Sequence, residues 1–430
     1  MFLLGKKGGV VPAGSQAVSH HHIPGWQGAT QRAKLGIVAA APRRIADARA
    51  LCLTVGLALM SNTGLLGAGV AADPGLEANS SGDIQVSASA HPLHLGFACE
   101  LATEPLEKLF ADPAVVPDLQ ALHAEVSLAL GDLSPGRASV VRRLNEADIP
   151  VTAWMALPAA QGYYVNAGNA PQAAARFAEL EKWTAENGLR WAAIGLDIEP
   201  NIQEFAALRN RRLRLAATLA ERYFEFERIR KARREYAALI RQMQFRGYRV
   251  ETYQFPFIID EREARTTLLE RLFGLVDVRG DREVLMLYTS FNHAMDSALV
   301  WKYGPEAQAI VVGSTKSDPA TDARFPPLSW DELSRDLRVA SHFSHTVGVY
   351  SLEGCVHQGF LPRLASMTWN QPVTIPAEAV RKVNLLRARI HTVLWIGSNL
   401  PYLVLAVFFA IGWWLGRRRM RRRSAAGGGG

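Results

Sequence analysis

The chain has 430 residues, with 48 Lys or Arg against 40 Asp or Glu, which gives a net charge of +8 at pH 7. Most of the excess positive charge lies at the two ends: residues 1–49 carry +6, and residues 417–423 hold six arginines, which leaves −4 for the rest of the chain. Positive charge gathered at the ends of the chain, next to apolar segments, is typical of a membrane protein and argues against a nucleic-acid-binding surface. The length is enough for one large domain or two ordinary ones.

The N-terminal 90 residues divide into three segments. Residues 1–49 are rich in Gly, Ala and His without periodicity, and are either a disordered cytoplasmic extension or sequence upstream of the true start. Residues 50–72 contain no charged residue, follow three arginines and end with small residues, which predicts a secretory signal peptide. An uncleaved membrane anchor is the alternative for this segment. Residues 73–90 include the small, polar run EANSSGDIQVSASA and are expected to form a linker.

Residues 91–375 alternate between short apolar runs and helical stretches, as a parallel sheet covered by helices does. The helix over 169–188 is expected to end at Gly188, another to stop at Gly247, and Ser329 is placed to cap a third. Eight strands are expected, within 93–100, 125–131, 150–158, 190–199, 248–258, 283–291, 308–315 and 345–355. Eight such units predict an α/β fold, the (β/α)8 TIM barrel. A doubly wound open sheet is the alternative, but no Gly-rich phosphate loop follows the first strand.

Two carboxylates end the fourth predicted strand, in the run GLDIEP. Asp197 and Glu199 are two residues apart, so in a strand their side chains point to the same face. Active sites of TIM barrels lie at the C-terminal ends of the strands. A charged Asp197 next to Glu199 would raise the pKa of Glu199, as a general acid requires.

The ends of the other predicted strands carry further polar and aromatic side chains. Aromatic rings that stack on sugar rings, together with carboxylates, predict a carbohydrate site. The expected substrate-binding residues are Trp154, Tyr253, Gln254, Glu353 and Glu100.

These motifs resemble those of the chitinase-type glycoside hydrolases. LDIEP is similar to the second half of their D-x-x-D-x-D-x-E motif, and LMLYTSF to their M-x-Y segment. The resemblance implies that Glu199 is the general acid, that Asp197 orients an N-acetyl group of the substrate, and that Tyr288 holds the acetamido oxygen. It implies a polysaccharide or oligosaccharide substrate and no cofactor.

The chain departs from that family at several positions. The two earlier Asp positions of the motif are Ala192 and Gly195, and the strand-eight tryptophan is missing, with Tyr350 and Glu353 nearby instead. A D-x-E strand end is also similar to that of lysozyme-type barrels. Two alternatives therefore remain open: a non-catalytic barrel that binds glycan or a protein partner, or carboxylates that only bind Arg or backbone amides at the barrel rim.

The exported segment contains two cysteines, Cys99 and Cys355, at the ends of the first and last predicted strands. These strands are neighbours in a closed barrel, so we expect a disulfide, with two separate buried thiols as the alternative. Histidines are scattered, with only His342 and His345 closely spaced, so no metal site is expected.

An unusually long connection, 202–246, separates the fourth and fifth predicted strands. Residues 207–249 hold thirteen Lys or Arg against four Glu, on one or two helices. The arginine-rich face is either solvated or faces anionic lipid head groups or an acidic glycan.

The C-terminal residues predict a single membrane span. Residues 376–392 form a juxtamembrane segment, and the 24 residues 393–416 are uncharged, long enough to cross a hydrocarbon core of about 30 Å. The six arginines in the tail, 417–430, favour a cytoplasmic C-terminus, so the barrel is expected outside the cytoplasm and bound to the cell membrane.

Overall fold

The structure is a computed structural model that describes residues 82–86, 94–201, 204, 212–317 and 325–426. The predicted N-terminal extension (1–49), the predicted signal peptide or anchor (50–72) and most of the predicted linker lie outside these residues. All described residues belong to one compact unit within Arg43–Gly430.

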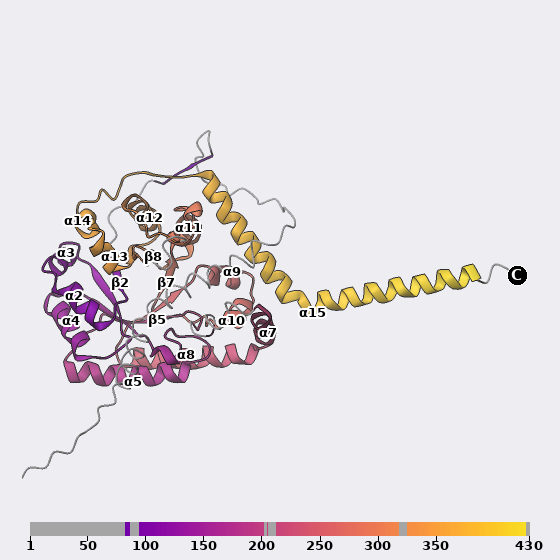
Figure 1. Ribbon diagram of the computed structural model, residues 1–430, viewed down its shortest axis with the longest axis horizontal. Helices are drawn as coiled ribbons and strands as arrows, with labels where there is room; N and C mark the ends of the chain where they lie inside the picture. The colour runs from indigo at the N-terminus through magenta and orange to yellow at the C-terminus, as the bar shows by residue number, and fades with distance from the viewer. Residues whose placement is uncertain (1–81, 87–93, 202–203, 205–211, 318–324, 427–430) are drawn as a thin grey trace, which may run out of the picture. The chain divides into compact units, whose positions relative to one another are not determined.

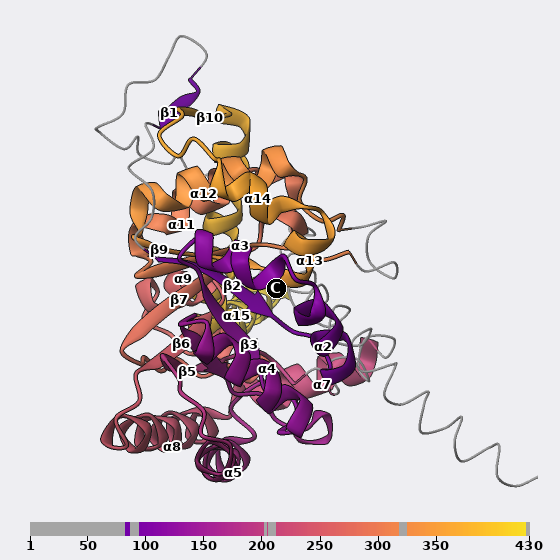
Figure 2. The same ribbon diagram turned by 90° about the vertical axis from the view of Figure 1, so that its left-hand side faces the viewer.

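Eight of the described strands form a closed, all-parallel barrel (Figures 1 and 2). Its strands are β2 (His94–Cys99), β3 (Glu125–Ala129), β4 (Val151–Trp154), β5 (Ala193–Asp197), β6 (Val250–Gln254), β7 (Arg282–Leu287), β8 (Ala309–Gly313) and β9 (Thr346–Tyr350). Each strand pairs with the next in sequence, and pairing of β2 with β9, with Ala98 opposite Tyr350, closes the ring. The predicted TIM barrel is therefore confirmed, and the open doubly wound sheet is excluded.

Helices follow the strands and cover the outside of the barrel (Figure 2). They are α2 (Thr103–Ala111), α3 (Val115–Ala121), α4 (Pro135–Glu146), α5 (Ala170–Asn187), α7 (Arg212–Tyr223), α8 (Phe226–Phe245), α9 (Phe257–Glu263), α10 (Leu268–Phe273), α11 (Ala298–Tyr303), α12 (Trp330–Phe343), α13 (Leu352–His357), α14 (Phe360–Ala365) and α15 (Ala377–Ala426). Short 3-10 turns lie at Ala159–Gln161, Thr289–Phe291, His293–Met295 and Gly304–Glu306.

Local sequence signals fix several helix ends as expected. Ser329 and Glu332 form a reciprocal capping box at the start of α12, each side chain accepting a backbone N–H of the other residue. Gly188 ends α5 in the left-handed conformation, which a glycine adopts without steric cost. Gly247 has a positive φ directly after α8.

Strand alternation sorts side chains between the helical layer and the barrel interior. The outward side chains are large and apolar, as with Phe97, Val126 and Leu128, and they are buried under the helices. The inward positions include small residues, and a Cβ at Gly195 would lie 2.8 Å from the Tyr253 ring. The interior is thus partly filled by a few large inward side chains next to glycines.

A small antiparallel sheet joins the two ends of the barrel domain. β1 (Ile84–Val86) pairs with β10 (Val373–Ile375), and the Asp83 side chain accepts a hydrogen bond from the first N–H of α15. Neither three-residue strand was expected, and β1 lies within the predicted linker.

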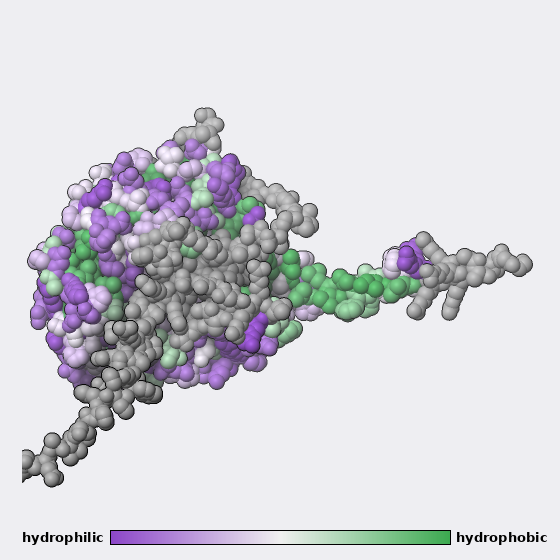
Figure 3. All heavy atoms as spheres, viewed as in Figure 1, coloured by the Kyte–Doolittle hydropathy of each residue, from purple (hydrophilic) through white to green (hydrophobic). Residues whose placement is uncertain are grey.

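The C-terminal helix α15 includes both the predicted juxtamembrane segment and the predicted span. Its first part packs against α9, α10 and α11. Over Ala377–Arg418 it is long and apolar enough to cross a membrane, by length and composition. Beyond residue 394 its large apolar side chains are exposed, and Figure 3 shows them as a hydrophobic stretch that ends at a hydrophilic one.

Candidate functional site

The two carboxylates lie on extended backbone at the end of β5: Asp197 is the last residue of the strand, and Glu199 lies two residues beyond it. Val165, in the loop after β4, forms a parallel bridge with Ile198: its N–H donates to Asp197 O, and its carbonyl accepts from Glu199 N–H. On the other side, Ile198 N–H donates to Tyr253 O. Because the backbone stays extended, Asp197 and Glu199 keep the inward orientation of Gly195. Both carboxylates are 2% exposed.

A second group at the C-terminal end of the barrel is centred on Glu100, one residue after β2. Its two carboxylate oxygens accept hydrogen bonds from the hydroxyl groups of Tyr164, at 3.0 Å, and Tyr350, at 2.6 Å. The Tyr350 ring stacks on Tyr288, which follows β7, with ring centroids 5.5 Å apart. Since Tyr164 precedes Val165, the loop after β4 links the Asp197–Glu199 segment to Glu100.

An ion pair lies next to this group. Lys316, three residues after β8, has its ammonium nitrogen 3.3 Å from a carboxylate oxygen of Glu353, the second residue of α13. Although burial lowers the pKa of Lys316, the negative charges of Glu353 and Glu100 raise it, so this cation stays charged at neutral pH. The C-terminal end of the barrel thus combines carboxylates, phenols and one ammonium.

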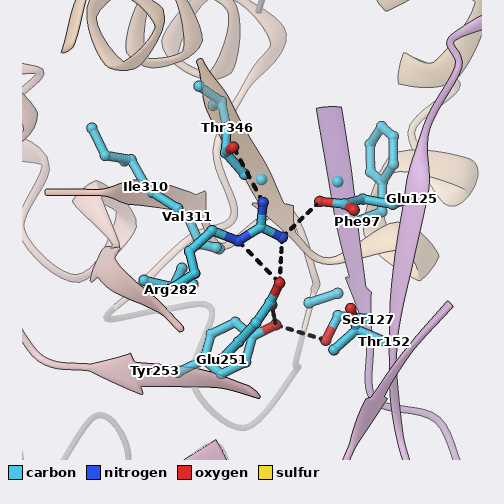
Figure 4. Close-up of a pocket in the computed structure, with 16 residues that line it drawn as sticks. Phe97, Glu125, Ser127, Thr152, Glu251, Tyr253, Arg282, Ile310, Val311 and Thr346 are labelled. Carbon is cyan, nitrogen blue, oxygen red and sulfur yellow. Dashed lines mark hydrogen bonds and ion pairs between the residues drawn. The ribbon is translucent and has the colours of Figure 1, made fainter. Parts of the chain in front are cut away.

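The N-terminal half of the barrel interior contains a separate polar network (Figure 4). Arg282 bonds Glu251 and lies 3.4 Å from Glu125, and Tyr253 donates to Glu251 at 2.9 Å and hydrogen-bonds Ser127 at 3.0 Å. These side chains line a cavity of about 40 Å³. Burial, with the charge of Glu251 adding to it, raises the pKa of Tyr253 well above its usual value. Tyr253 therefore belongs to this internal network, with its hydroxyl directed toward the N-terminal half.

Among the other predicted substrate-binding residues, Gln254 does not face the barrel interior. Its side-chain amide donates to the backbone carbonyl of Val276, outside the barrel. This follows from strand alternation, since Gln254 is adjacent to the inward Tyr253. Trp154 is buried at the end of β4, with its ring 6.5 Å from that of Tyr253, so it lies inside the barrel.

The predicted disulfide is absent from the structure, which has Cys99 and Cys355 as free, buried thiols. Cys355 does not end a strand: β9 stops at Tyr350, and Cys355 lies in α13, with its sulfur 3.6 Å from the Thr315 hydroxyl. Burial raises the pKa of both thiols, so neither is an activated nucleophile.

Among the described residues, one group has a spacing compatible with metal ligands: Asp260, Glu263 and His391. It lies outside the barrel, between α9 and α15. Arg387 already bonds both carboxylates, at 2.8 Å and 2.9 Å, and Tyr303 donates to Asp260 at 2.6 Å. The group is therefore an ion-pair cluster that holds α15 against the barrel.

Two of the residues at the C-terminal end of the barrel were missed by sequence reasoning. Lys316 was detectable, because it follows a predicted strand end directly. Tyr164 was not, because it lies in the middle of a connection without periodicity, and only its hydrogen bond to Glu100 reveals its position.

No protein-family model matches this chain, and no curated protein does either. Several solved structures are similar to it, including the following two. One is the PgaB (BpsB) glycoside hydrolase domain from Bordetella bronchiseptica, with a TM-score of 0.37, 11% identity, and coverage of 63% of this chain and 96% of that one. The other is the D-allulose 3-epimerase from Methylomonas sp., with a TM-score of 0.34, 12% identity, and coverage of 70% and 99%. The fold assignment rests on the closed strand pairing of this chain itself.

Proposed function

We propose that this chain is a membrane-anchored glycoside hydrolase that acts outside the cytoplasm on a cell-envelope or extracellular glycan containing N-acetyl sugars. The observation that carries the proposal is the backbone pairing of Val165 with Ile198. It keeps the backbone extended from Asp197, the last residue of β5, to Glu199, which supports an orientation of both carboxylates toward the axis at the C-terminal end of the barrel. This is the end at which TIM barrels hold their active sites.

In the proposed reaction, Glu199 protonates the leaving-group oxygen of the glycosidic bond. Asp197 orients the N-acetyl group of the sugar, whose oxygen attacks the anomeric carbon, and Tyr288 donates a hydrogen bond to that acetamido oxygen. Burial of a carboxyl group favours its neutral form, as does a second carboxylate beside it, so the position of Glu199 suits a general acid. Glu100, Trp154 and Glu353 are proposed to contact the sugar, and Tyr253 to support them from within the barrel.

A second candidate is a non-catalytic barrel that binds glycan or a protein partner on the cell surface. The position of Gly195 favours it. A Cβ there would lie 2.8 Å from the Tyr253 ring, so the aspartate that the chitinase-type motif has at this position does not fit. Without an aspartate at position 195, Asp197 cannot exchange a proton with a neighbouring aspartate there, as the resemblance to the chitinase-type family would require.

The test is turnover of N-acetylglucosamine oligosaccharides by the full chain and by Glu199→Gln. The amide keeps the size of the side chain but cannot deliver a proton, so we expect hydrolysis to fall by about 10²–10⁴-fold while binding persists. Glu104→Gln, on the exposed surface of α2, is the matched control and should retain full activity. Equal rates for Glu199→Gln and wild type would reject the proposed acid. Saturable binding without turnover by the wild type would favour the second candidate.

A further inference from the structure

A cavity of about 800 Å³ lies between the barrel domain and the beginning of the apolar part of α15. Its lining on the barrel side includes Tyr223, Phe226, Arg265 and Arg271. Ser398 and Tyr402 of α15 line the other side. The cavity therefore lies next to the first turns of the predicted span, well outside the candidate active site.

The α15 side of the cavity is fixed by specific contacts. The Tyr223 hydroxyl donates to Gly397 O at 2.6 Å, and the Ser398 hydroxyl donates to the Thr266 hydroxyl at 2.9 Å. Gly397 packs directly on Leu268, since a Cβ at 397 would lie only 2.2 Å from Leu268 Cδ2. The cavity is thus bounded by side chains held in place from both sides.

The arginines that line the cavity fall into two classes. Arg233 pairs with Glu270, and Arg262 pairs with Asp277 and Glu283, so their charges are compensated. Within the described part of the chain, no ion pair is formed by Arg265, which is exposed, or by Arg271, which is 2% exposed.

Arg271 is the side chain that most clearly requires a partner. Its guanidinium carbon lies 3.9 Å from the centroid of the Phe226 ring, and its Nε donates to Thr267 O at 3.1 Å. Its buried Nη1 has no hydrogen-bond partner among the described residues. A buried donor left without a partner is destabilising, and more so when it is charged, so an anion in this cavity is stabilised.

The surroundings of the cavity limit the kind of anion. Phe224 and Phe226 are exposed on the barrel side, and Tyr402 is exposed on α15, followed by the exposed apolar side chains of the predicted span. Aromatic side chains of this kind suit the boundary between lipid head groups and hydrocarbon. The occupant therefore combines a negative group with an apolar tail that runs along α15.

We propose that this cavity binds the phosphodiester head group of an anionic phospholipid in the leaflet that faces the barrel. Arg265 and Arg271 supply the positive charge, the Thr266 hydroxyl, which accepts from Ser398, supplies a neutral donor, and the acyl chains lie against Tyr402 and the apolar residues beyond it. The proposal rests on the membrane anchoring included in the proposed function, and it is independent of glycan hydrolysis.

The test is native mass spectrometry of the full chain in detergent, titrated with phosphatidylglycerol or with phosphatidylcholine of identical acyl chains. We expect the anionic lipid to bind at least about tenfold more tightly, and Arg265→Gln to weaken its binding about tenfold or more, as loss of a charged hydrogen bond does. Arg265 is exposed and its replacement leaves the packing intact, whereas Arg271→Gln serves as a second variant that also tests the buried charge. Arg230→Gln, an exposed arginine of α8, is the matched control and should bind like wild type.

Equal affinity for the two lipids, or unchanged binding by Arg265→Gln, would overturn the proposal. Displacement of phosphatidylglycerol by equimolar inorganic phosphate would also overturn it, because the site would then recognise free phosphate. Failure of the chain to insert into lipid nanodiscs would reject the anchoring itself, whereas insertion without preference for the anionic lipid rejects only this site.

Discussion

At the residue scale, Glu261 is a buried carboxyl group that lines the cavity between the barrel domain and α15. It accepts hydrogen bonds from the backbone N–H groups of Leu269, at 2.6 Å, and Glu270, at 3.2 Å, at the beginning of α10. Burial, with the nearby charge of Glu270 adding to it, raises the pKa of Glu261 from 4.5 to about 8. The folded protein therefore holds a proton on this group at neutral pH.

This shift predicts a pH-dependent stability difference. Because the folded pKa lies above the unfolded value of 4.5, the contribution of protonated Glu261 to stability is complete below pH 4.5 and is lost as the pH rises through about 8. Glu261→Gln has no such proton to lose. We expect the denaturant midpoint of the variant to gain on that of wild type between pH 5 and pH 9. A variant that instead becomes relatively less stable over this range would show that the backbone amides favour the charged carboxylate.

The alternation of side chains along a strand explains which residues of the predicted site face the barrel interior and which do not. The two-residue spacing of Asp197 and Glu199 predicts that they share a face, and the extended backbone through Ile198 is consistent with that prediction. The same rule places Tyr253 and Gln254 on opposite faces, so only one of them lies inside the barrel. Whether an inward residue serves the C-terminal end or the internal network depends on barrel shear, which sets the height of each residue relative to other strands. No local pattern encodes that height for Tyr253.

At the element scale, the docking of α15 depends on a glycine. Gly397 allows the helix to approach Leu268 closely, which also brings Tyr223 and Ser398 into hydrogen-bonding position. A larger side chain at 397 must displace the buried Leu268 side chain or push the helix away from α10.

We therefore expect Gly397→Val to destabilise the docked helix by about 1–3 kcal/mol, a typical cost of overpacking. Thermal unfolding of the full chain in detergent measures the effect. Gly412→Val is the control, because a Cβ at 412 meets no atom within 4 Å. If both variants lower the melting temperature equally, the loss reflects helix propensity and not the contact with Leu268.

The elements that sequence reasoning found were those with long, regular patterns. All eight barrel strands and the capped helices follow from periodicity and from Ser, Gly and Pro positions. The strands β1 and β10 were missed because three residues are too few for a periodic pattern, and their pairing spans most of the chain. The charges of residues 376–392 predicted a juxtamembrane segment distinct from the span. In the structure both belong to one continuous helix, α15, because Arg387 and His391 form ion pairs with Asp260 of the barrel domain.

At the scale of the whole molecule, the proposed membrane topology rests on the apolar run of α15 and the arginines after it. We propose, by the positive-inside rule, that residues after Arg423 lie in the cytoplasm and the barrel lies outside. Protease added to intact spheroplasts is expected to digest the barrel and to spare an epitope fused after residue 423. A cytoplasmic marker protein that stays intact is the control, and digestion of the epitope with protection of the barrel would reverse the orientation.

The pairing of β1 with β10 means that the polypeptide enters and leaves the barrel domain at one place, directly before α15. Residues 82–376 therefore form a unit whose coding sequence can be rearranged as one block. Its ends lie side by side, so they can be joined and new ends opened in an exposed loop, as circular permutation does, without breaking any ladder of the barrel.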